Sequence, residues 1–197
     1  MFEVAGPTLT LRLPGPEHVD ALFALGRDPE VTRWFSWGPY ESVEEPRAWV
    51  AGAAARREAG DRFELVIERA GEVLGVTSLM ELSRRDRRAM VGTWFGRSYW
   101  GTGANAESKA LVLHLAFEVL GLQRVGAYSE VNHDRSQRAL EKVGFVREGV
   151  LREWHRHPDG VHDVVVFGLL RSEWSSDVAV RVGGEPPAAF NCAETPT

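Results

Sequence analysis

The segment with the clearest chemical meaning is glycine-rich and covers residues 100–105 (WGTGAN). It lies between a predicted strand and a predicted helix. Gly101 and Gly103 allow the backbone to turn tightly and leave amide N–H groups uncovered. The start of the following helix adds unpaired N–H donors and the positive end of the helix dipole. This combination is typical of a phosphate-binding turn, and a glycine-rich turn that merely begins a helix is the competing interpretation.

Histidines and carboxylates supply the candidate acid–base groups, because histidine titrates near neutral pH. Of the six histidines, His155 lies in the penultimate predicted strand, where it is either a catalytic base or an exposed hairpin residue. His157 and His162 lie nearer the turn, so we expect them to be exposed to solvent. Glu81, at a strand end, is either a second candidate base or a surface residue. The one cysteine, Cys192, can form neither an internal disulfide nor a cysteine metal cluster.

Aromatic side chains are concentrated just before the second predicted helix, at Trp34, Phe35, Trp37 and Tyr40. They follow neither a helical nor a strand period. Such a group either lines a ligand site or covers the sheet as part of the core.

The elements that must position these residues follow from local patterns. Residues 8–13 alternate between apolar and polar types and predict a strand. Two helices follow, the second after a capping-box pattern at Ser42 and Glu45. Residues 62–95 contain three strand-like runs, and a strong helix follows Gly103. A strand, a helix and two further strands complete the order, which predicts an α/β fold with one mixed sheet covered by helices.

The length of 197 residues fits a single domain. We expect it to cover residues 1–174, because residues 175–197 are small, polar and rich in Pro and Gly and predict a tail. With 23 Lys and Arg against 28 Asp and Glu, the formal charge is −5, which argues against direct nucleic-acid binding. No apolar run approaches the roughly 20 residues of a membrane span, and the first residues lack signal-peptide features. We therefore expect a cytoplasmic protein without a membrane partner.

Three features together resemble the GCN5-related N-acetyltransferases (GNAT): residues 100–105, the amphipathic helix after them, and residues 132–145 (NHDRSQRALEKVGF). Within that family the chain is most similar to the branch that acetylates the N-termini of ribosomal proteins (RimJ/RimL type). The resemblance covers residues 9–174. It implies the GNAT fold, with a mixed central β-sheet of about seven strands flanked by about four helices.

The resemblance also implies acetyl-CoA as the cosubstrate and no metal. In the family, main-chain N–H groups of the glycine loop hold the diphosphate, and pantetheine pairs with the splayed fourth strand. The asparagine position of the family holds His133 here, with Asn132 one residue earlier. The residues that the resemblance assigns to acetyl-CoA are Thr93, Trp94, Phe95, Trp100, Gly101, Thr102, Gly103, Ala104, Asn105, Ala106, Asn132, His133 and Ser136.

Two catalytic roles follow from the same resemblance. Ser136 corresponds to the serine that the ribosomal branch places near the sulfur, so it is a candidate proton donor to the thiolate, and a serine that only caps the helix is the alternative. Leu140 stands where many members carry a tyrosine for this task. His155 lies where the branch often places a glutamate facing the acceptor amine, so it is the candidate general base. A backbone N–H near Trp94 or Phe95 would meet the oxyanion.

The acceptor side of the resembling family borders the aromatic group. The candidate substrate-binding residues are therefore Trp34, Phe35, Trp37, Tyr40 and Glu81.

We therefore expect an N-acetyltransferase that moves the acetyl group of acetyl-CoA directly to a primary amine, with a protein N-terminus as the favoured acceptor. At pH 7, neutralising an α-amine of pKa about 8 costs about 1.4 kcal/mol, whereas a lysine of pKa about 10.4 costs about 5 kcal/mol.

Two alternatives stay open. A small amine or antibiotic as acceptor would need an acidic pocket, which Glu81, Glu130 and Asp163 could supply. A noncatalytic acyl-CoA sensor would bind the coenzyme without turning it over. A homodimer is an expectation from the family alone.

Overall fold

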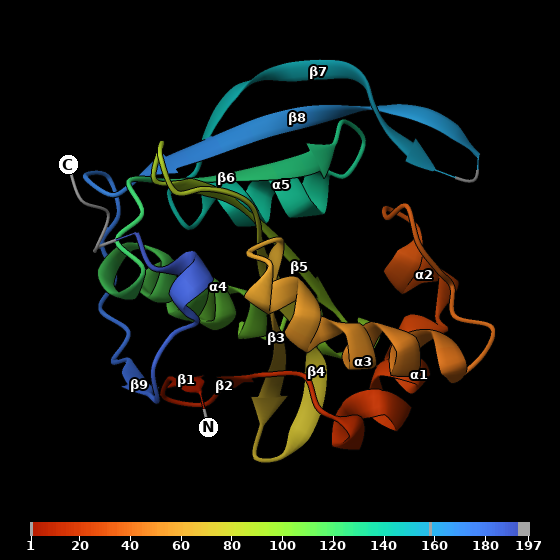
Figure 1. The fold of residues 1–197 in the computed structure, drawn as a ribbon. Helices are drawn as coiled ribbons and strands as arrows, with labels where there is room; N and C mark the ends of the chain where they lie inside the picture. The colour runs from red at the N-terminus through yellow and green to blue at the C-terminus, as the bar shows by residue number, and fades with distance from the viewer. Residues whose placement is uncertain (1, 158, 193–197) are drawn as a thin grey trace.

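The computed structural model describes residues 2–157 and 159–192 and has one mixed β-sheet with helices on both faces (Figure 1). The sheet has nine strands in the order β7-β8-β6-β5-β4-β3-β2-β1-β9. Neighbours are antiparallel except β5 and β6, which are parallel. The strands are β1 (Glu3–Ala5), β2 (Thr10–Arg12), β3 (Arg62–Arg69), β4 (Glu72–Ser83), β5 (Arg88–Phe95), β6 (Arg124–Glu130), β7 (Val146–His157), β8 (Gly160–Leu170) and β9 (Arg181–Gly183).

The predicted α/β fold is confirmed, and the structure adds two strands and one short helix to the expected set. The added strands, β1 and β9, have three residues each, which is too short for an apolar alternation to show in the sequence. The α-helices are α1 (Val19–Gly26), α2 (Pro29–Thr32), α3 (Glu44–Glu58), α4 (Ala104–His114) and α5 (Asp134–Glu141). A π-helical turn, Leu115–Val119, extends α4.

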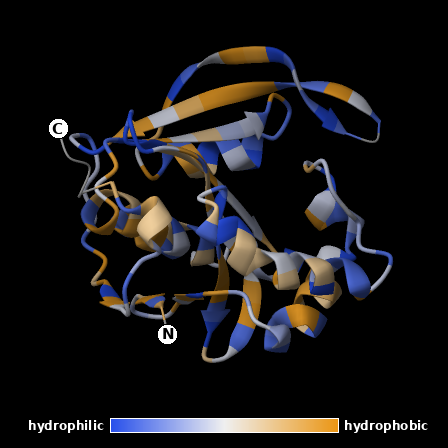
Figure 2. Cartoon of the chain, viewed as in Figure 1, coloured by the Kyte–Doolittle hydropathy of each residue, from blue (hydrophilic) through white to orange (hydrophobic). Residues whose placement is uncertain are grey.

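The sheet separates two apolar layers. Along β3, Leu65 belongs to a buried cluster that includes Leu111 of α4. The next residue, Val66, points to the other face and packs with Leu22 of α1 and Val50 of α3. This alternation is what the two-residue period of a strand requires. In Figure 2, β8 carries a long hydrophobic stretch, whereas hydrophobic and hydrophilic residues alternate along β7, the edge strand.

The predicted capping box at the start of α3 forms only in part, because the N-cap is Val43 and Ser42 bonds to the residue before Glu45. The Ser42 hydroxyl accepts a hydrogen bond from the N–H of Glu44 (3.2 Å). The Glu45 carboxylate accepts one from the N–H of Ser42 (3.0 Å). These reciprocal bonds satisfy N–H groups that have no partner inside the helix.

The segment after Trp174, which the sequence predicts as a tail, is docked against the domain as far as it is described. β9 pairs with β1, and Phe190 and Cys192 are fully buried. The Phe190 ring lies 5.2 Å from that of Phe63 in β3. A few apolar anchors in a polar segment are enough for docking, and their partners lie far away in the sequence. The last five residues, 193–197, lie outside the described part of the chain.

Among the helices of the described residues, none combines the length and apolar character needed to span a membrane.

Candidate functional site

The glycine loop at the start of α4 has the backbone conformation that a phosphate site needs. Gly101 and Gly103 have φ angles of 75° and 87°, in the left-handed region that favours glycine. A Cβ atom at either position would meet nothing within 4 Å. The requirement for glycine is therefore conformational and not steric. The Thr102 hydroxyl donates to the carbonyl of Tyr99 (2.8 Å), which holds the turn closed.

Free N–H donors face outward at this helix entrance. The N–H groups of Ala106 and Glu107 donate to the carbonyl of Gly103 (3.0 and 3.3 Å). Within residues 2–157 and 159–192, the N–H groups of Ala104 and Asn105 have no hydrogen-bond acceptor. Together with the helix dipole, they form an anion site.

The one acidic side chain in the first turn of α4 is turned away from the loop. The Glu107 carboxylate accepts hydrogen bonds from the N–H and hydroxyl of Thr8 (2.7 and 2.6 Å) and from the N–H of Leu9 (2.8 Å). Its charge is thus used to anchor the segment before β2. It does not oppose an anion at the loop.

A cation that the sequence analysis missed lies beside the loop. The Arg135 guanidinium of α5 stacks over the Trp100 ring at 3.5 Å, and the Trp100 indole N–H donates to the carbonyl of Phe95 (3.0 Å). The loop, the end of β5 and the start of α5 are thereby joined. The sequence signals for this cation–π pair are the aromatic residue at position 100 and the arginine at the start of α5.

The sheet splits beside the loop. β5 and β6 pair only from Arg88 to Met90 on one strand and from Arg124 to Gly126 on the other. β5 then continues to Phe95 and β6 to Glu130 without pairing with each other. This splay leaves one edge of β5, which includes Thr93 and Trp94, open toward β6.

The start of α5 borders the same opening. His133 stacks on Trp34 with ring centroids 4.7 Å apart, and its Nε2 atom is buried with no hydrogen-bond partner among the described residues. Burial, helped by the charge of Arg135, lowers the pKa of His133 to about 4. Ser136 is half-buried in the first turn of α5, where no side chain caps the helix, so the capping role considered for Ser136 is not observed. Asn132 is exposed.

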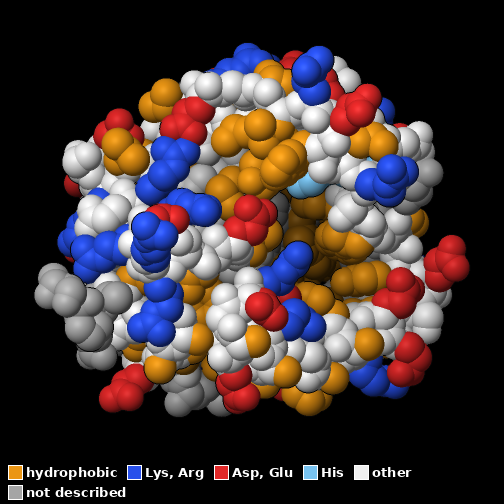
Figure 3. Space-filling view, turned by 45° about the horizontal axis from the view of Figure 1, so that its top comes forward, with side chains coloured by type: hydrophobic (Ala, Val, Ile, Leu, Met, Phe, Trp, Pro, Cys, Tyr) orange, Lys and Arg blue, Asp and Glu red, His pale blue; other side chains and the backbone are white. Residues whose placement is uncertain are grey.

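The aromatic group divides in two. Trp34 stacks on His133 at the start of α5. The other aromatic residues pack around Trp37, whose ring centroid lies 5.4 Å from that of Phe35, 5.2 Å from that of Tyr40 and 5.3 Å from that of Trp94. These side chains are half-buried, so they line an opening as well as cover the sheet. Figure 3 shows a hollow with hydrophobic walls and a histidine at its rim.

The tip of the β7–β8 hairpin bends over the end of β6. The register shifts between Leu151 and His155, and Glu153 has a positive φ of 51°. The Asp163 carboxylate accepts a hydrogen bond from the N–H of Glu153 (2.8 Å), so Asp163 fixes the backbone at the bend. A bulge of this kind re-aims the side chains that follow it.

The bend produces a buried histidine–carboxylate cluster. Nε2 of His157 lies 3.4 Å from Oε1 of Glu130, and Nδ1 of His162 lies 3.1 Å from Oε2. His157 and Glu130 are 7% and 5% exposed. The prediction that His157 is exposed is therefore wrong, because the bulge turns the hairpin inward. His162 is half-buried, and its prediction is only partly right.

His155 lies beside this cluster, with its ring stacked 6.2 Å from that of His157. Its ring meets that of Tyr128 edge-on with centroids 5.5 Å apart, and the Tyr128 hydroxyl donates to Glu81 (3.3 Å). Burial, and then the charge of His157, lower the pKa of His155, so its ring is a neutral proton acceptor at neutral pH. One N or O atom of each of Glu130, His155 and His157 lies within 4.8 Å of the others, a spacing suited to a metal ion. Oε1 of Glu130 is buried without a hydrogen-bond partner among the described residues, and its 3.4 Å contact with His157 is an ion pair only when that ring is protonated.

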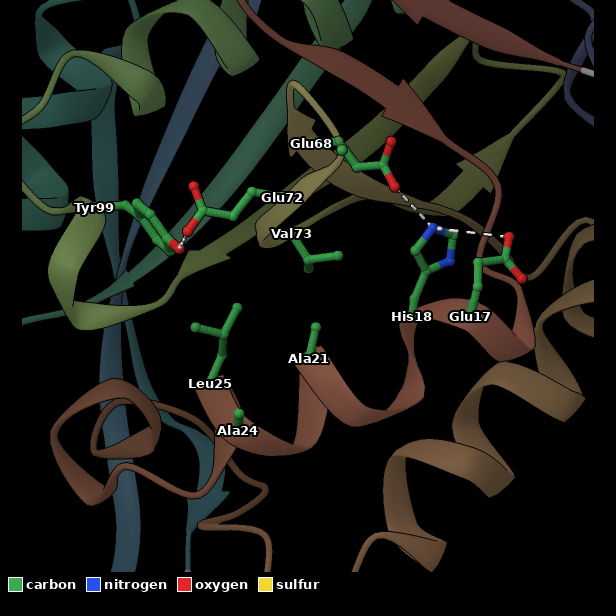
Figure 4. Close-up of a pocket in the computed structure, with 10 residues that line it drawn as sticks. Glu17, His18, Ala21, Ala24, Leu25, Glu68, Glu72, Val73 and Tyr99 are labelled. Atoms are coloured by element: carbon green, nitrogen blue, oxygen red, sulfur yellow. Dashed lines mark hydrogen bonds and ion pairs between the residues drawn. The ribbon is translucent and has the colours of Figure 1, made fainter.

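A separate cavity of about 450 Å³ lies between α1 and the β3–β4 turn (Figure 4). In it, Nε2 of His18 contacts Oε1 of Glu68 (3.0 Å), and the Tyr99 hydroxyl donates to Glu72 (2.6 Å). With Glu17, three carboxylates line this cavity. Their charge disfavours a phosphate there, so the anion site is the glycine loop alone.

Known proteins share this architecture. A family model described as an acetyltransferase (GNAT) domain matches residues 8–146. The uncharacterized N-acetyltransferase p20 of Bacillus licheniformis is 28% identical over 85% of this chain and 95% of its own.

Two solved structures are similar as well. One, from T. thermophilus and described as a candidate acetyltransferase, is 36% identical over 87% of this chain and 90% of its own, with a TM-score of 0.77. The other, RimL, a ribosomal L7/L12 alpha-N-protein acetyltransferase in complex with coenzyme A, is 25% identical over 83% of this chain and 94% of its own, with a TM-score of 0.74.

The His133–Trp34 stack allows a direct test of the site. We expect Trp34→Ala to raise the pKa of His133 from about 4 toward its ordinary value of 6.5, because burial is the main cause of the lowered value. An NMR titration of the imidazole signals measures this. Phe35→Ala is the control, because Phe35 packs on Trp37 instead. An unchanged pKa of His133 in the Trp34 variant would show that the Trp34 ring does not shield His133 from water.

Proposed function

The chain belongs to the GNAT acetyltransferase family, and on this premise we propose that it transfers the acetyl group of acetyl-CoA directly to the N-terminal amine of a protein. As a family member it is an acetyl-CoA-dependent acyltransferase and not a noncatalytic sensor. The observation that carries the proposal is the coincidence of two features: outward N–H donors at the entrance of α4 and an open edge of β5 beside them.

The residues fit acetyl-CoA. The loop from Trp100 to Ala106 would hold the diphosphate through main-chain N–H groups, with Arg135 adding a positive charge nearby. The open edge of β5 at Thr93, Trp94 and Phe95 would bind pantetheine as an added strand does. At the start of α5, Asn132, His133 and Ser136 border the same opening. When bound, the coenzyme supplies the activated acetyl thioester.

The acid–base groups of the proposal are His155 on β7 and Ser136 on α5. His155 takes the proton that the acceptor amine loses as its nitrogen forms the amide bond. Ser136 donates a proton to the departing thiolate as the C–S bond breaks. An N–H of β5 near Trp94 or Phe95 stabilises the negative charge that develops on the carbonyl oxygen.

The acceptor is proposed to enter over the aromatic group that includes Trp37, Tyr40 and Trp94. RimL acts on a protein N-terminus, as its name states, and the low free-energy cost of neutralising an α-amine agrees with such a substrate. Two of the three carboxylates that could serve a small amine are already engaged, Glu130 with two histidines and Asp163 with the N–H of Glu153, which leaves only Glu81, itself an acceptor for the Tyr128 hydroxyl. This favours the protein N-terminus over a small amine.

The proposed function is tested by a free-thiol release assay with acetyl-CoA. We expect peptides with free N-termini to be acetylated faster than N-blocked peptides of the same sequence that contain lysine, and faster than polyamines or aminoglycosides. Mass spectrometry of the product locates the acetyl group. Faster turnover of a small amine than of every peptide tested would contradict the assigned acceptor class.

The coenzyme site predicts the effect of one substitution. Gly103→Val should abolish binding of acetyl-CoA, because a β-branched residue cannot adopt the φ of 87° that presents the N–H donors. Titration calorimetry measures this. Gly71→Val is the matched control, because Gly71 has a φ of 83° and open space around it but lies in the β3–β4 turn. Equal affinities in the two variants would remove the loop from the site.

The base predicts a second effect. The wild-type rate should fall as the pH drops below the pKa of His155, because protonation removes the proton acceptor. His155→Ala should lower kcat by about 10²-fold or more and flatten this pH dependence, with unchanged affinity for acetyl-CoA. The control is His114→Ala, since His114 lies on α4 against Trp174. Wild-type activity in the His155 variant would assign the proton transfer to another group or to water.

A further inference from the structure

Lys109 is a buried lysine that the proposed mechanism does not use. It lies on α4 and is 5% exposed. Its Nζ atom donates to the Thr93 hydroxyl. Burial alone lowers its pKa to about 7, and no charged group contributes to the shift. A lysine in such surroundings is held without a counter-ion and favours the neutral amine.

The hydrogen bonds around Lys109 form a chain with a fixed direction. A carbonyl oxygen only accepts, so the Thr77 hydroxyl donates to the carbonyl of Gly92 (3.2 Å). Thr77 has then used its only hydrogen, so the 2.8 Å contact between the two threonines must be donated by Thr93. The Thr93 oxygen remains free to accept from Lys109. The Gly92 carbonyl thus fixes the direction of the chain, and the Thr93 oxygen is left as the acceptor for Lys109.

The chain connects the two features that carry the proposed function. Thr93 lies three residues beyond Met90, the last residue of β5 that pairs with β6. Lys109 lies on the same helix as the N–H donors of Ala104 and Asn105. The helix that would hold the diphosphate is thus tied by one side chain to the strand that would hold pantetheine.

We propose that Lys109 is a positioning residue for acetyl-CoA, acting through Thr93 to fix the open edge of β5 relative to the entrance of α4. The inference rests on the proposed function and adds a residue to its coenzyme site. Lys109 touches neither the loop nor the reacting atoms. It acts by holding two coenzyme-binding elements in register.

The surroundings of Lys109 determine how the tie responds to pH. On α4 itself, the Glu107 carboxylate is bound to Thr8 and Leu9, and His114 packs on Trp174. From β4 and β5, the hydroxyls of the directed chain face the amine. With no anion to balance it, protonation of Lys109 below about pH 7 disfavours the buried arrangement.

The first test needs no coenzyme. Unfolded Lys109 has a pKa near 10.5 and folded Lys109 one of about 7, so between these values the unfolded state binds more protons and stability rises with pH. We expect Lys109→Met, which has no titratable group, to be more stable than the wild type at pH 7, with the difference shrinking toward pH 10. Denaturant unfolding at several pH values measures this. A difference that does not change with pH would contradict a neutral buried amine.

The second test uses calorimetric binding of acetyl-CoA. We expect Lys109→Met to weaken binding about tenfold, and the wild-type affinity to fall from pH 8 to pH 6 more steeply than that of the variant. Lys142→Met is the matched control, since Lys142 is the only other lysine of the chain and is exposed. Thr93→Val should weaken binding similarly, and the double variant should be no weaker than either single variant.

Each outcome is decisive. Additive losses in the double variant, or Lys109→Met binding like Lys142→Met at every pH, would overturn the positioning role, while binding by the wild type would still support the proposed function. An absence of binding by the wild type would overturn both. If Lys109→Met fails to fold, Thr93→Val carries the test, and unchanged affinity in that variant overturns the inference.

Discussion

The short pairing between β5 and β6 is the constraint on which the rest of the structure depends. Parallel strands that stayed paired to their ends would leave no free backbone groups in the middle of the sheet. Because pairing ends at Met90 and Gly126, β5 keeps one edge unpaired inside a closed domain. α4 begins beside this edge, and β6 carries Glu130 to its far end. The glycine loop follows the end of β5, and Glu130 of the histidine cluster ends β6, so the two lie on opposite sides of the splay.

The two sides of the splay, at the ends of β5 and β6, have different chemistry. At the loop, the donors are N–H groups with the guanidinium of Arg135 nearby, and Glu107 is turned away to Thr8, which suits an anion. At the end of β6, carboxylates and imidazoles predominate, and His157 and His162 both contact Glu130. This arrangement suits an amine and the movement of its proton.

Local patterns made most of the fold predictable. The glycine loop, α4 and the β7–β8 hairpin each show in a few consecutive residues, so they could be predicted from sequence. The splay, the bend at Glu153 that buries His157, and the docking of Phe190 could not, because each depends on partners distant in sequence. Lys109 is an instructive case. It lies three residues before Val112 on the apolar face of α4. The helical pattern of the sequence indicates this position, but the residue type alone does not indicate a role.

The pairing of β1 with β9 joins residues 3–5 to residues 181–183. This edge of the sheet cannot form during synthesis until residues 181–183 have been translated, and Phe63 is not covered by Phe190 until later still. Bringing β1 and β9 together costs chain entropy, and only the contacts that then form offset this cost. The β1–β9 edge is therefore one of the last parts of this domain to form.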